Sequence, residues 1–264
     1  MMSTTAPVAV LRPDGVAQAE RTIAIEAPVA IEVDGFGYAV MMMTPADLEA
    51  FAVGFALTER LADSAADVEA VEPFETEAGW IVRIALSARC RGRIHDRVRH
   101  RASDTSCGLC GIAGLEQLRR PAPCAPRPQV SRAALFAALA ALRDHQPLNA
   151  MTGAVHAAAA CDRDGRIVAV FEDVGRHNAL DKLVGGRASA GDAIDGFVLV
   201  TSRISFEMVD KALIAGAPLL AGISAPTSLA VEHARAHGLT LIALARRDAM
   251  LVLNDPWGEF PPAA

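Results

Sequence analysis

Residues 196–245 have the sequence GFVLVTSRISFEMVDKALIAGAPLLAGISAPTSLAVEHARAHGLTLIALA. Short apolar runs alternate here with longer stretches in which apolar residues recur at helical spacing. The runs span residues 196–201, 218–223 and 240–245, and the stretches between them span 205–215 and 227–237. We predict strands for the runs and helices for the stretches. Alternating units of this kind predict a mostly parallel sheet with helices packed on its faces.

Upstream of this segment the same pattern continues. Two further candidate strands, at 155–161 and 166–172, flank a turn with the sequence DRDG, and a helix is expected at about 177–184. Ser131 is expected to cap an earlier helix that presents Leu135, Leu139 and Leu142 on one face. Before it, four prolines lie within eight residues, at positions 121, 123, 126 and 128, so this stretch is predicted to be a linker.

The N-terminal half predicts a second, smaller unit. Residues up to about Glu20 are interpreted as a loose tail. Short β-type runs follow, and a helix is expected to begin at Thr44, because a proline and an acid follow it at capping positions. The runs lie at 22–25, 30–33, 38–42, 67–72 and 80–86. The predicted division is a tail at 1–20, an α+β domain at 21–125 and an α/β domain at 126–264.

Composition limits the class of protein. A chain of 264 residues with 52% hydrophobic content can form one large core or two modest ones without a disulfide or metal staple. Five cysteines make an odd count, which favours a reducing compartment. Neither a secretory signal nor a membrane span is recognised, so a cytoplasmic location without a membrane partner is predicted. With a formal charge of −6, the chain is not expected to bind nucleic acid.

A thiol pair, Cys107 and Cys110, lies in the glycine-containing segment 105–111, TSCGLCG. Two thiols at this spacing can hold zinc, cycle as a disulfide or carry sulfur. A structural zinc site would need two more ligands, drawn from Cys90, Cys124, His95 and His100. A dithiol redox role is disfavoured, because the pair does not begin a helix in a βαβ unit.

A basic stretch precedes the thiols. Residues 89–101 contain six arginines and one acid, whereas the whole chain is acidic. The stretch could be a solvated strand or loop, but its position beside the thiols favours function. We predict that it binds an anion or lowers the pKa of the thiols.

Polar side chains follow the predicted strands, where helix N-termini with free amides attract anions. Arg176 and His177 follow one strand, and the others follow the next three: Thr201, Ser202, Arg203, Thr227, Arg246 and Arg247. Helix capping alone can explain Thr227, but it does not require arginines or a histidine. The sequence therefore predicts a pocket for a phosphate-bearing ligand at this rim.

Five motifs, in this order, carry a resemblance to a known family. They are SCGLCG at 106–111, TGAVHAAA at 152–159, EDVGRHNALDK at 172–182, SFEMV at 205–209 and SAPTSLAVE at 224–232. The chain from about residue 20 to 256 resembles the formate dehydrogenase accessory sulfurtransferases, the FdhD family. The resemblance implies a fold with a cytidine-deaminase-like mixed sheet, helices on both of its faces, and a smaller α+β N-terminal domain.

The same resemblance implies a sulfurtransferase. Such a protein accepts sulfur from a cysteine desulfurase as a persulfide on Cys107, with Cys110 as its partner. It delivers the sulfur to the molybdenum (or tungsten) bis-guanine-dinucleotide cofactor, its substrate, for the formate dehydrogenase catalytic subunit. The resemblance also implies a homodimer that binds guanine nucleotides such as GDP as mimics. The residues that match the cofactor-binding stretch are Leu244, Ala245, Arg246, Arg247, Asp248 and Ala249.

A zinc-dependent deaminase would share such a second domain. Its chemistry needs a His-x-Glu motif and a Pro-Cys-x-x-Cys motif at two helix starts. Residues 172–177 and 201–205 contain no cysteine, and the CxxC pair lies before this domain. Deamination is therefore not expected.

Overall fold

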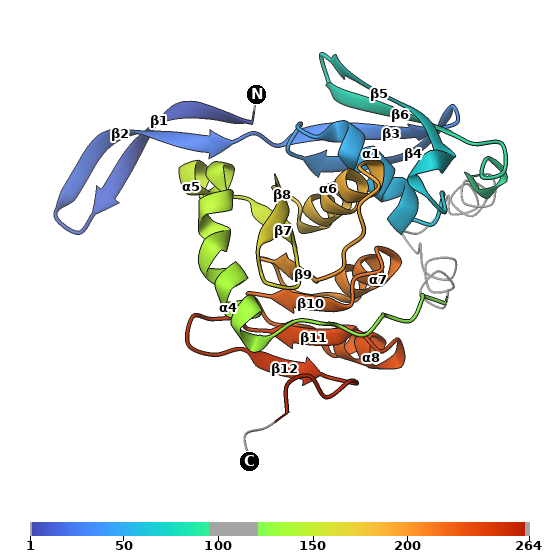
Figure 1. Cartoon of the computed structure of the whole chain (residues 1–264). Helices are drawn as coiled ribbons and strands as arrows, with labels where there is room; N and C mark the ends of the chain where they lie inside the picture. The colour runs from blue at the N-terminus through green and yellow to red at the C-terminus, as the bar shows by residue number, and fades with distance from the viewer. Residues whose placement is uncertain (1, 95–120, 262–264) are drawn as a thin grey trace.

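Two β-sheets form the body of the molecule in this computed structural model, which describes residues 2–94 and 121–261. The smaller sheet has the strand order β4-β3-β6-β5 and packs against helix α1 (Figure 1). Its elements are β3 (Ala27–Val33), β4 (Phe36–Met43), α1 (Leu48–Thr58), η1 (Ala65–Asp67), β5 (Val68–Thr76) and β6 (Gly79–Leu86). The strands predicted in this half are confirmed.

Buried and less buried residues alternate along β3, one of the two inner strands of this sheet. In β3, Val29, Ile31 and Val33 are fully buried, and the residues between them are not. A strand with this period of two buries one face against the core. The predicted helix start is wrong, because α1 begins at Leu48 and the Thr44 hydroxyl instead accepts a hydrogen bond from the Val174 amide, 3.2 Å away.

The larger sheet has the strand order β12-β11-β10-β9-β7-β8. Its strands are β7 (His156–Cys161), β8 (Ile167–Asp173), β9 (Phe197–Val200), β10 (Leu219–Gly222), β11 (Thr240–Ala243) and β12 (Leu251–Asn254). Strands β9, β10 and β11 run parallel to one another, whereas β7 pairs antiparallel with both β8 and β9, and β12 pairs antiparallel with β11. The sheet is therefore mixed, and the expectation of a mostly parallel sheet is wrong; β12 has no counterpart among the predicted strands.

Helices cover both faces of the larger sheet, as predicted (Figure 1). Side chains of the first group pack on one face with Phe197, Leu199 and Ile242, and those of the second pack on the other with Val198 and Val200. The first group is α4 (Arg132–Ala141) and η2 (Leu142–His145), and the second is α6 (Arg176–Ser189), α7 (Phe206–Ile214) and α8 (Ser228–Ala236). Helix α5 (Pro147–Thr152) follows η2 in the chain. Alternate residues of one strand point to opposite faces, so each strand contributes to both cores.

The N-terminal segment is a hairpin and not a loose tail. Strands β1 (Ser3–Arg12) and β2 (Gly15–Ala24) pair antiparallel over their whole length. The turn between them contains Pro13 and Asp14 and is followed by Gly15, whose φ of 157° suits glycine. We call this hairpin the arm, and it extends away from the body (Figure 1). Among the described residues, no helix is long and apolar enough to cross a membrane.

Two glycines bring α1 and α6 into backbone contact. A β-carbon built on Gly54 would lie 1.8 Å from the Asp181 carbonyl oxygen, and one on Gly185 would lie 1.9 Å from the Ala50 carbonyl oxygen. These helices belong to different sheets, and their buried side chains join one continuous core. The two units therefore pack as one body.

We expect the substitution Gly185→Ala to lower the free energy of unfolding by about 2 to 3 kcal/mol, because the added methyl group must push two backbones apart. Urea unfolding followed by circular dichroism measures this change. The control is Gly37→Ala, where the new methyl group meets open space, and its effect should stay within about 0.5 kcal/mol. Equal effects of the two substitutions would contradict the close packing.

Candidate functional site

Four strands of the larger sheet end on one edge, and the loops that follow them are joined there. The Ala157 amide donates to the Thr201 hydroxyl at 2.9 Å, the Ile204 amide donates to the Ala225 carbonyl at 3.2 Å, and the Leu244 amide donates to the Ser224 carbonyl at 3.2 Å. The predicted rim residues after β8, β9, β10 and β11 are thus brought together. We call this edge the rim.

Two arginines at the rim stand at the positive ends of helices. Arg176 is the first residue of α6, and Arg203 precedes Ser205, the N-cap of α7. The Arg176 Nε is buried without a partner, and the Arg203 guanidinium has none among residues 2–94 and 121–261. Neither helix start receives a side-chain capping bond within the described chain. Cations are unfavourable at this end of a helix, so the arrangement suits a bound anion.

His177 is neutral at physiological pH. Burial, followed by the charges of Arg176 and Lys211, lowers the pKa of its imidazole to about 4. Its Nε2 lies 3.9 Å from a Glu207 carboxylate oxygen, but a neutral ring forms no ion pair. Burial and then Arg176 also lower the pKa of His156, at the start of β7. Burial is the main cause of the lowered pKa in both imidazoles, and the charge of Arg176 adds to it.

Three rim hydroxyls have structural partners. Thr227 caps α8 and accepts from the Ala230 amide at 3.4 Å, as helix capping predicts. Thr201 holds Ala157 of β7, and the buried Ser202 hydroxyl donates to the Arg203 carbonyl at 3.2 Å. These side chains shape the loops, and the arginines are the groups that remain available to a ligand.

The stretch from Leu244 to Ala249 follows β11 and lies at the rim. Leu244 has a φ of 48°, a conformation that is strained for a residue with a side chain. The Arg246 amide donates to the Ala249 carbonyl at 2.8 Å, which closes a tight turn. The Arg246 guanidinium donates to the carbonyls of Ile223 and Ala245. The exposed residues of this turn are Arg246, Arg247, Asp248 and Ala249.

Other polar residues of the motif at 172–182 turn inward. Asp173 and Lys182 form a fully buried ion pair of 2.6 Å, and the Lys182 Nζ also donates to the Thr44 carbonyl at 3.0 Å. Asn178 donates to Asp173 and to the Met42 carbonyl, at 3.0 and 2.9 Å. Asp173 and Asn178 therefore attach the rim to the smaller sheet.

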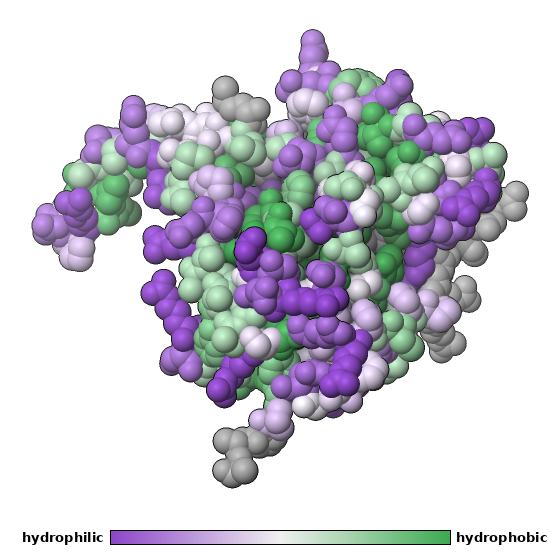
Figure 2. Space-filling model, in the orientation of Figure 1, coloured by the Kyte–Doolittle hydropathy of each residue, from purple (hydrophilic) through white to green (hydrophobic). Residues whose placement is uncertain are grey.

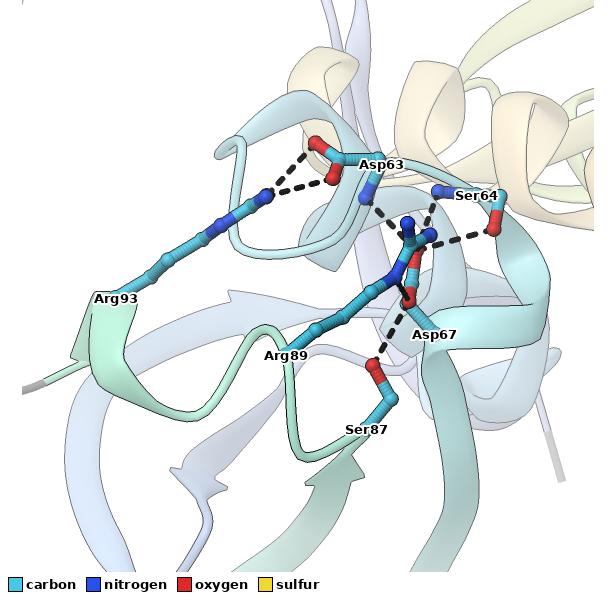
Figure 3. Close-up of polar contacts among 6 residues, drawn as sticks. All are labelled: Asp63, Ser64, Asp67, Ser87, Arg89 and Arg93. Carbon is cyan, nitrogen blue, oxygen red and sulfur yellow. Dashed lines mark hydrogen bonds and ion pairs between the residues drawn. The ribbon is translucent and has the colours of Figure 1, made fainter.

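The first half of the basic stretch is neutralised (Figure 3). Arg89 forms two hydrogen bonds of 2.5 and 2.6 Å with Asp67, and Arg93 forms two of 2.8 and 2.6 Å with Asp63. Arg91 pairs with Glu69 at 3.4 Å. The hydrogen bond from Arg89 is the largest cause that holds the pKa of Asp67 well below its usual range. These three arginines are therefore held by acids of the same unit. Arg97, Arg99 and Arg101 lie outside the described residues, so the role of the stretch in binding an anion or lowering the pKa of the thiols stays a prediction.

The CxxC pair, Cys107 and Cys110, lies outside the described residues, as do His95 and His100. Of the other cysteines, Cys90 is fully buried and Cys124 is exposed. Burial raises the pKa of Cys161 to about 12, so this thiol is unreactive.

The described chain on either side of residues 95–120 lies far from the rim arginines. Asp63, the partner of Arg93, and Pro123 both line a cavity of about 800 Å³ at the C-terminal ends of α6 and α7. Arg176 lies at the other end of α6, about 20 Å away at 1.5 Å per residue. Arg93 and the rim arginines therefore lie at opposite ends of α6.

The fold and the rim define an α/β protein with arginines at one edge of its larger sheet, and comparisons with known proteins narrow this class. A model of the FdhD/NarQ family matches residues 24–257. The sulfur carrier protein FdhD of Bordetella petrii is 43% identical over 244 residues, which cover 92% of this chain and 88% of that protein. The protein of the same name from Agrobacterium fabrum is 46% identical over 239 residues, 89% of this chain and 88% of that protein.

A solved structure has a similar fold over nearly the whole chain. A crystal structure described as that of a formate dehydrogenase accessory protein from Desulfotalea psychrophila superposes with a TM-score of 0.77 and 26% identity. The match covers 97% of this chain and 98% of that one. The chain belongs to the FdhD/NarQ family, which confirms the resemblance found in its motifs.

We expect the His177 ring to titrate at about pH 4 in a ¹H–¹³C NMR spectrum, with its signal assigned by its loss in His177→Asn. Arg176→Gln should raise that pKa, because it removes a cation that opposes protonation. The unfolded chain binds this proton nearer the ordinary value of 6.5, so His177 lowers the free energy of unfolding as the pH falls from about 6.5 to about 4. A titration midpoint near 6.5 would contradict the buried, positive setting.

Proposed function

We propose that the protein is a sulfur carrier in formate dehydrogenase maturation. Its relatives carry the name sulfur carrier protein FdhD, and the matched crystal structure is described as a formate dehydrogenase accessory protein. The observation that carries the proposal is the pair of unpartnered arginines, Arg176 and Arg203, at two helix N-termini. A substrate that bears pyrophosphates, such as a molybdenum or tungsten bis-guanine-dinucleotide cofactor, supplies the missing anion.

The proposed chemistry begins at Cys107. Its thiolate attacks the outer sulfur of a persulfide on a cysteine desulfurase, a new S–S bond forms, and the donor cysteine leaves as a thiolate. Cys107 then holds the persulfide, and no net oxidation has occurred. For delivery, the Cys110 thiolate attacks the Cys107 Sγ: a Cys107–Cys110 disulfide forms, the bond to the outer sulfur breaks, and that sulfur leaves as sulfide for the cofactor. The dithiol supplies the two electrons, and a thiol reductant restores it. The rim arginines hold the cofactor by charge-assisted hydrogen bonds. His177 is uncharged at neutral pH, so the positive charge of the site comes from the arginines.

The remaining features of the proposal follow the family resemblance. The larger sheet with its two helical layers is the cytidine-deaminase-like domain, and the protein acts in the cytoplasm as a homodimer. It receives sulfur from the desulfurase and serves the catalytic subunit of formate dehydrogenase. Cys90 lies fully buried in the core, which disfavours the rival zinc site built from it and the CxxC pair.

Incubation with a cysteine desulfurase and cysteine should add the mass of one sulfur atom to Cys107, because its thiolate is the proposed acceptor. Peptide mass spectrometry without reductant measures the gain. Cys107→Ala should abolish it, whereas Cys124→Ala, which removes an exposed thiol elsewhere in the chain, should leave it intact. Stoichiometric zinc in the purified protein, lost on Cys107→Ala, together with no added sulfur, would favour the zinc site instead.

GDP should bind at the rim, and Arg203→Ala should weaken its affinity by about tenfold or more, because a charge-assisted hydrogen bond is lost. Arg246→Ala should also weaken binding, since it opens the turn at 244–249. Isothermal titration calorimetry measures both. The matched control is Arg235→Ala in the last turn of α8, where the guanidinium bonds the Leu253 carbonyl. Unchanged affinity in Arg203→Ala would remove this residue from the site.

A further inference from the structure

A cavity of about 540 Å³ opens beside the turn at 244–249, on the face of the larger sheet against which α4 packs. This volume is typical of small-molecule sites. Its walls are the start of α4, strands β11 and β12, and the C-terminal segment 259–261. Ala249 and Met250, at the end of the turn, also line it. A ligand held at the turn can therefore extend directly into the cavity.

The walls of this cavity are mainly apolar. Leu135 of α4, Ile242 of β11 and Val252 of β12 contribute aliphatic side chains. Phe136 and Phe260 contribute aromatic rings, and both residues are only partly buried. On the face of the molecule that carries α4, Figure 2 shows hydrophobic residues beside strongly hydrophilic ones. Accessible aromatic rings bind flat heterocycles by stacking, so the cavity suits a nucleobase.

Two charged side chains, Arg132 and Glu259, also line the cavity. Arg132 is the first residue of α4, where a cation is unfavourable, and its guanidinium has no partner among residues 2–94 and 121–261. The Arg127 Nε donates to the Glu259 Oε1 at 2.7 Å, which leaves the second carboxylate oxygen without a hydrogen bond in the described chain. Both side chains can therefore form further hydrogen bonds with a ligand.

The C-terminal segment that forms one wall of the cavity is held in place. Asp255 accepts hydrogen bonds from the Glu259 and Phe260 amides, at 3.0 and 2.8 Å. The bond from Arg127 fixes the Glu259 carboxylate. The aromatic ring and the carboxylate are thus positioned before a ligand binds, which lowers the entropy cost of binding.

We infer that this cavity binds the guanine base of a nucleotide whose phosphates lie at the turn. Guanine presents two acceptors, O6 and N7, on one edge, and an arginine such as Arg132 can donate to both. Its next edge presents N1–H and the 2-amino group, which can both donate to the Glu259 carboxylate. Adenine has an amino group in place of O6 and would set a donor against Arg132. The inference rests on the proposed function, which supplies a nucleotide at the rim.

The phosphates of a nucleotide bound in this way reach the rim arginines. Arg246 and Arg247 are exposed in the turn, and the Arg247 guanidinium has no partner within the described chain. Strand β10 separates β9 from β11, so the ends of these two strands lie about 10 Å apart. A dinucleotide extended along the rim can therefore contact Arg203, after β9, and place its base in the cavity.

Isothermal titration calorimetry of the full chain with GDP and ADP tests this inference. The wild type should bind GDP about tenfold more tightly than ADP. Arg132→Ala should weaken GDP binding by about tenfold and remove most of the preference, because ADP does not form the lost hydrogen bonds. The matched control Arg143→Ala removes an exposed arginine of η2 outside the cavity and should change neither value. Unchanged GDP affinity and preference in Arg132→Ala would overturn the inference.

A photo-crosslink locates the base directly and covers a variant that fails to fold. Irradiation of the unchanged chain with 8-azido-GDP should attach the probe to residues 132–136 or 249–261, as peptide mass spectrometry measures, and excess GDP should suppress the product. Crosslinks confined to 172–178 or 201–207 would place the base at the rim and refute the inference, while the proposed nucleotide site would stand. If the wild type binds neither GDP nor the probe, that site fails together with the inference.

Discussion

A buried ion pair between Asp173 and Lys182 fixes the position of the larger sheet against the smaller one. Both side chains are fully buried, and the Thr44 amide and carbonyl complete their hydrogen bonds from the loop after β4. A charge removed from water is tolerated only when its partners are complete, and loss of one partner typically costs about 3 to 5 kcal/mol. The pair therefore fixes where the end of β8 meets the smaller sheet.

A second buried pair lies beside the first on α6. Lys211 of α7 contacts both oxygens of Asp181, at 2.8 and 2.9 Å, and donates to the Thr58 hydroxyl at the end of α1. Because Asp181 and Lys182 are adjacent, the two pairs hold the same turn of α6 on two sides. Because Arg176 begins the same helix, the rim is positioned by contacts that lie mostly in the smaller unit. The site at the edge of one sheet thus depends on the other sheet.

The sequence predicted the elements best where burial sets their pattern. The apolar runs of β9, β10 and β11 and the periodic helices between them are found within a few residues of the expected bounds. The arm was missed because its strands are exposed and so lack a clean alternation of apolar and polar residues. The antiparallel pairing of β7 with β9 depends on the tertiary fold, which local spacing does not encode.

At the site, residue type alone did not fully distinguish the side chains that are available to a ligand from those that stabilise the fold. Arg176, His177 and Arg203 gather at the rim as expected, because strand ends and helix starts are readable from sequence. By contrast, Arg89 and Arg93 pair with Asp67 and Asp63, which lie 22 and 30 positions away in the sequence. Local sequence patterns do not predict such pairs. Asp173 follows a strand just as a ligand would, and only the position of Lys182 in space shows that it faces inward.

The close contact between α1 and α6 at Gly54 and Gly185 makes the two units depend on each other, although a proline-rich linker joins them. Residues 121–128 look like a natural cutting point, yet a fragment that begins there would lose the helix whose backbone fills the groove at Gly185. The exposed groove would be lined by apolar side chains, and the fragment would aggregate unless the N-terminal unit were added to it. Each unit therefore needs the other to complete its core.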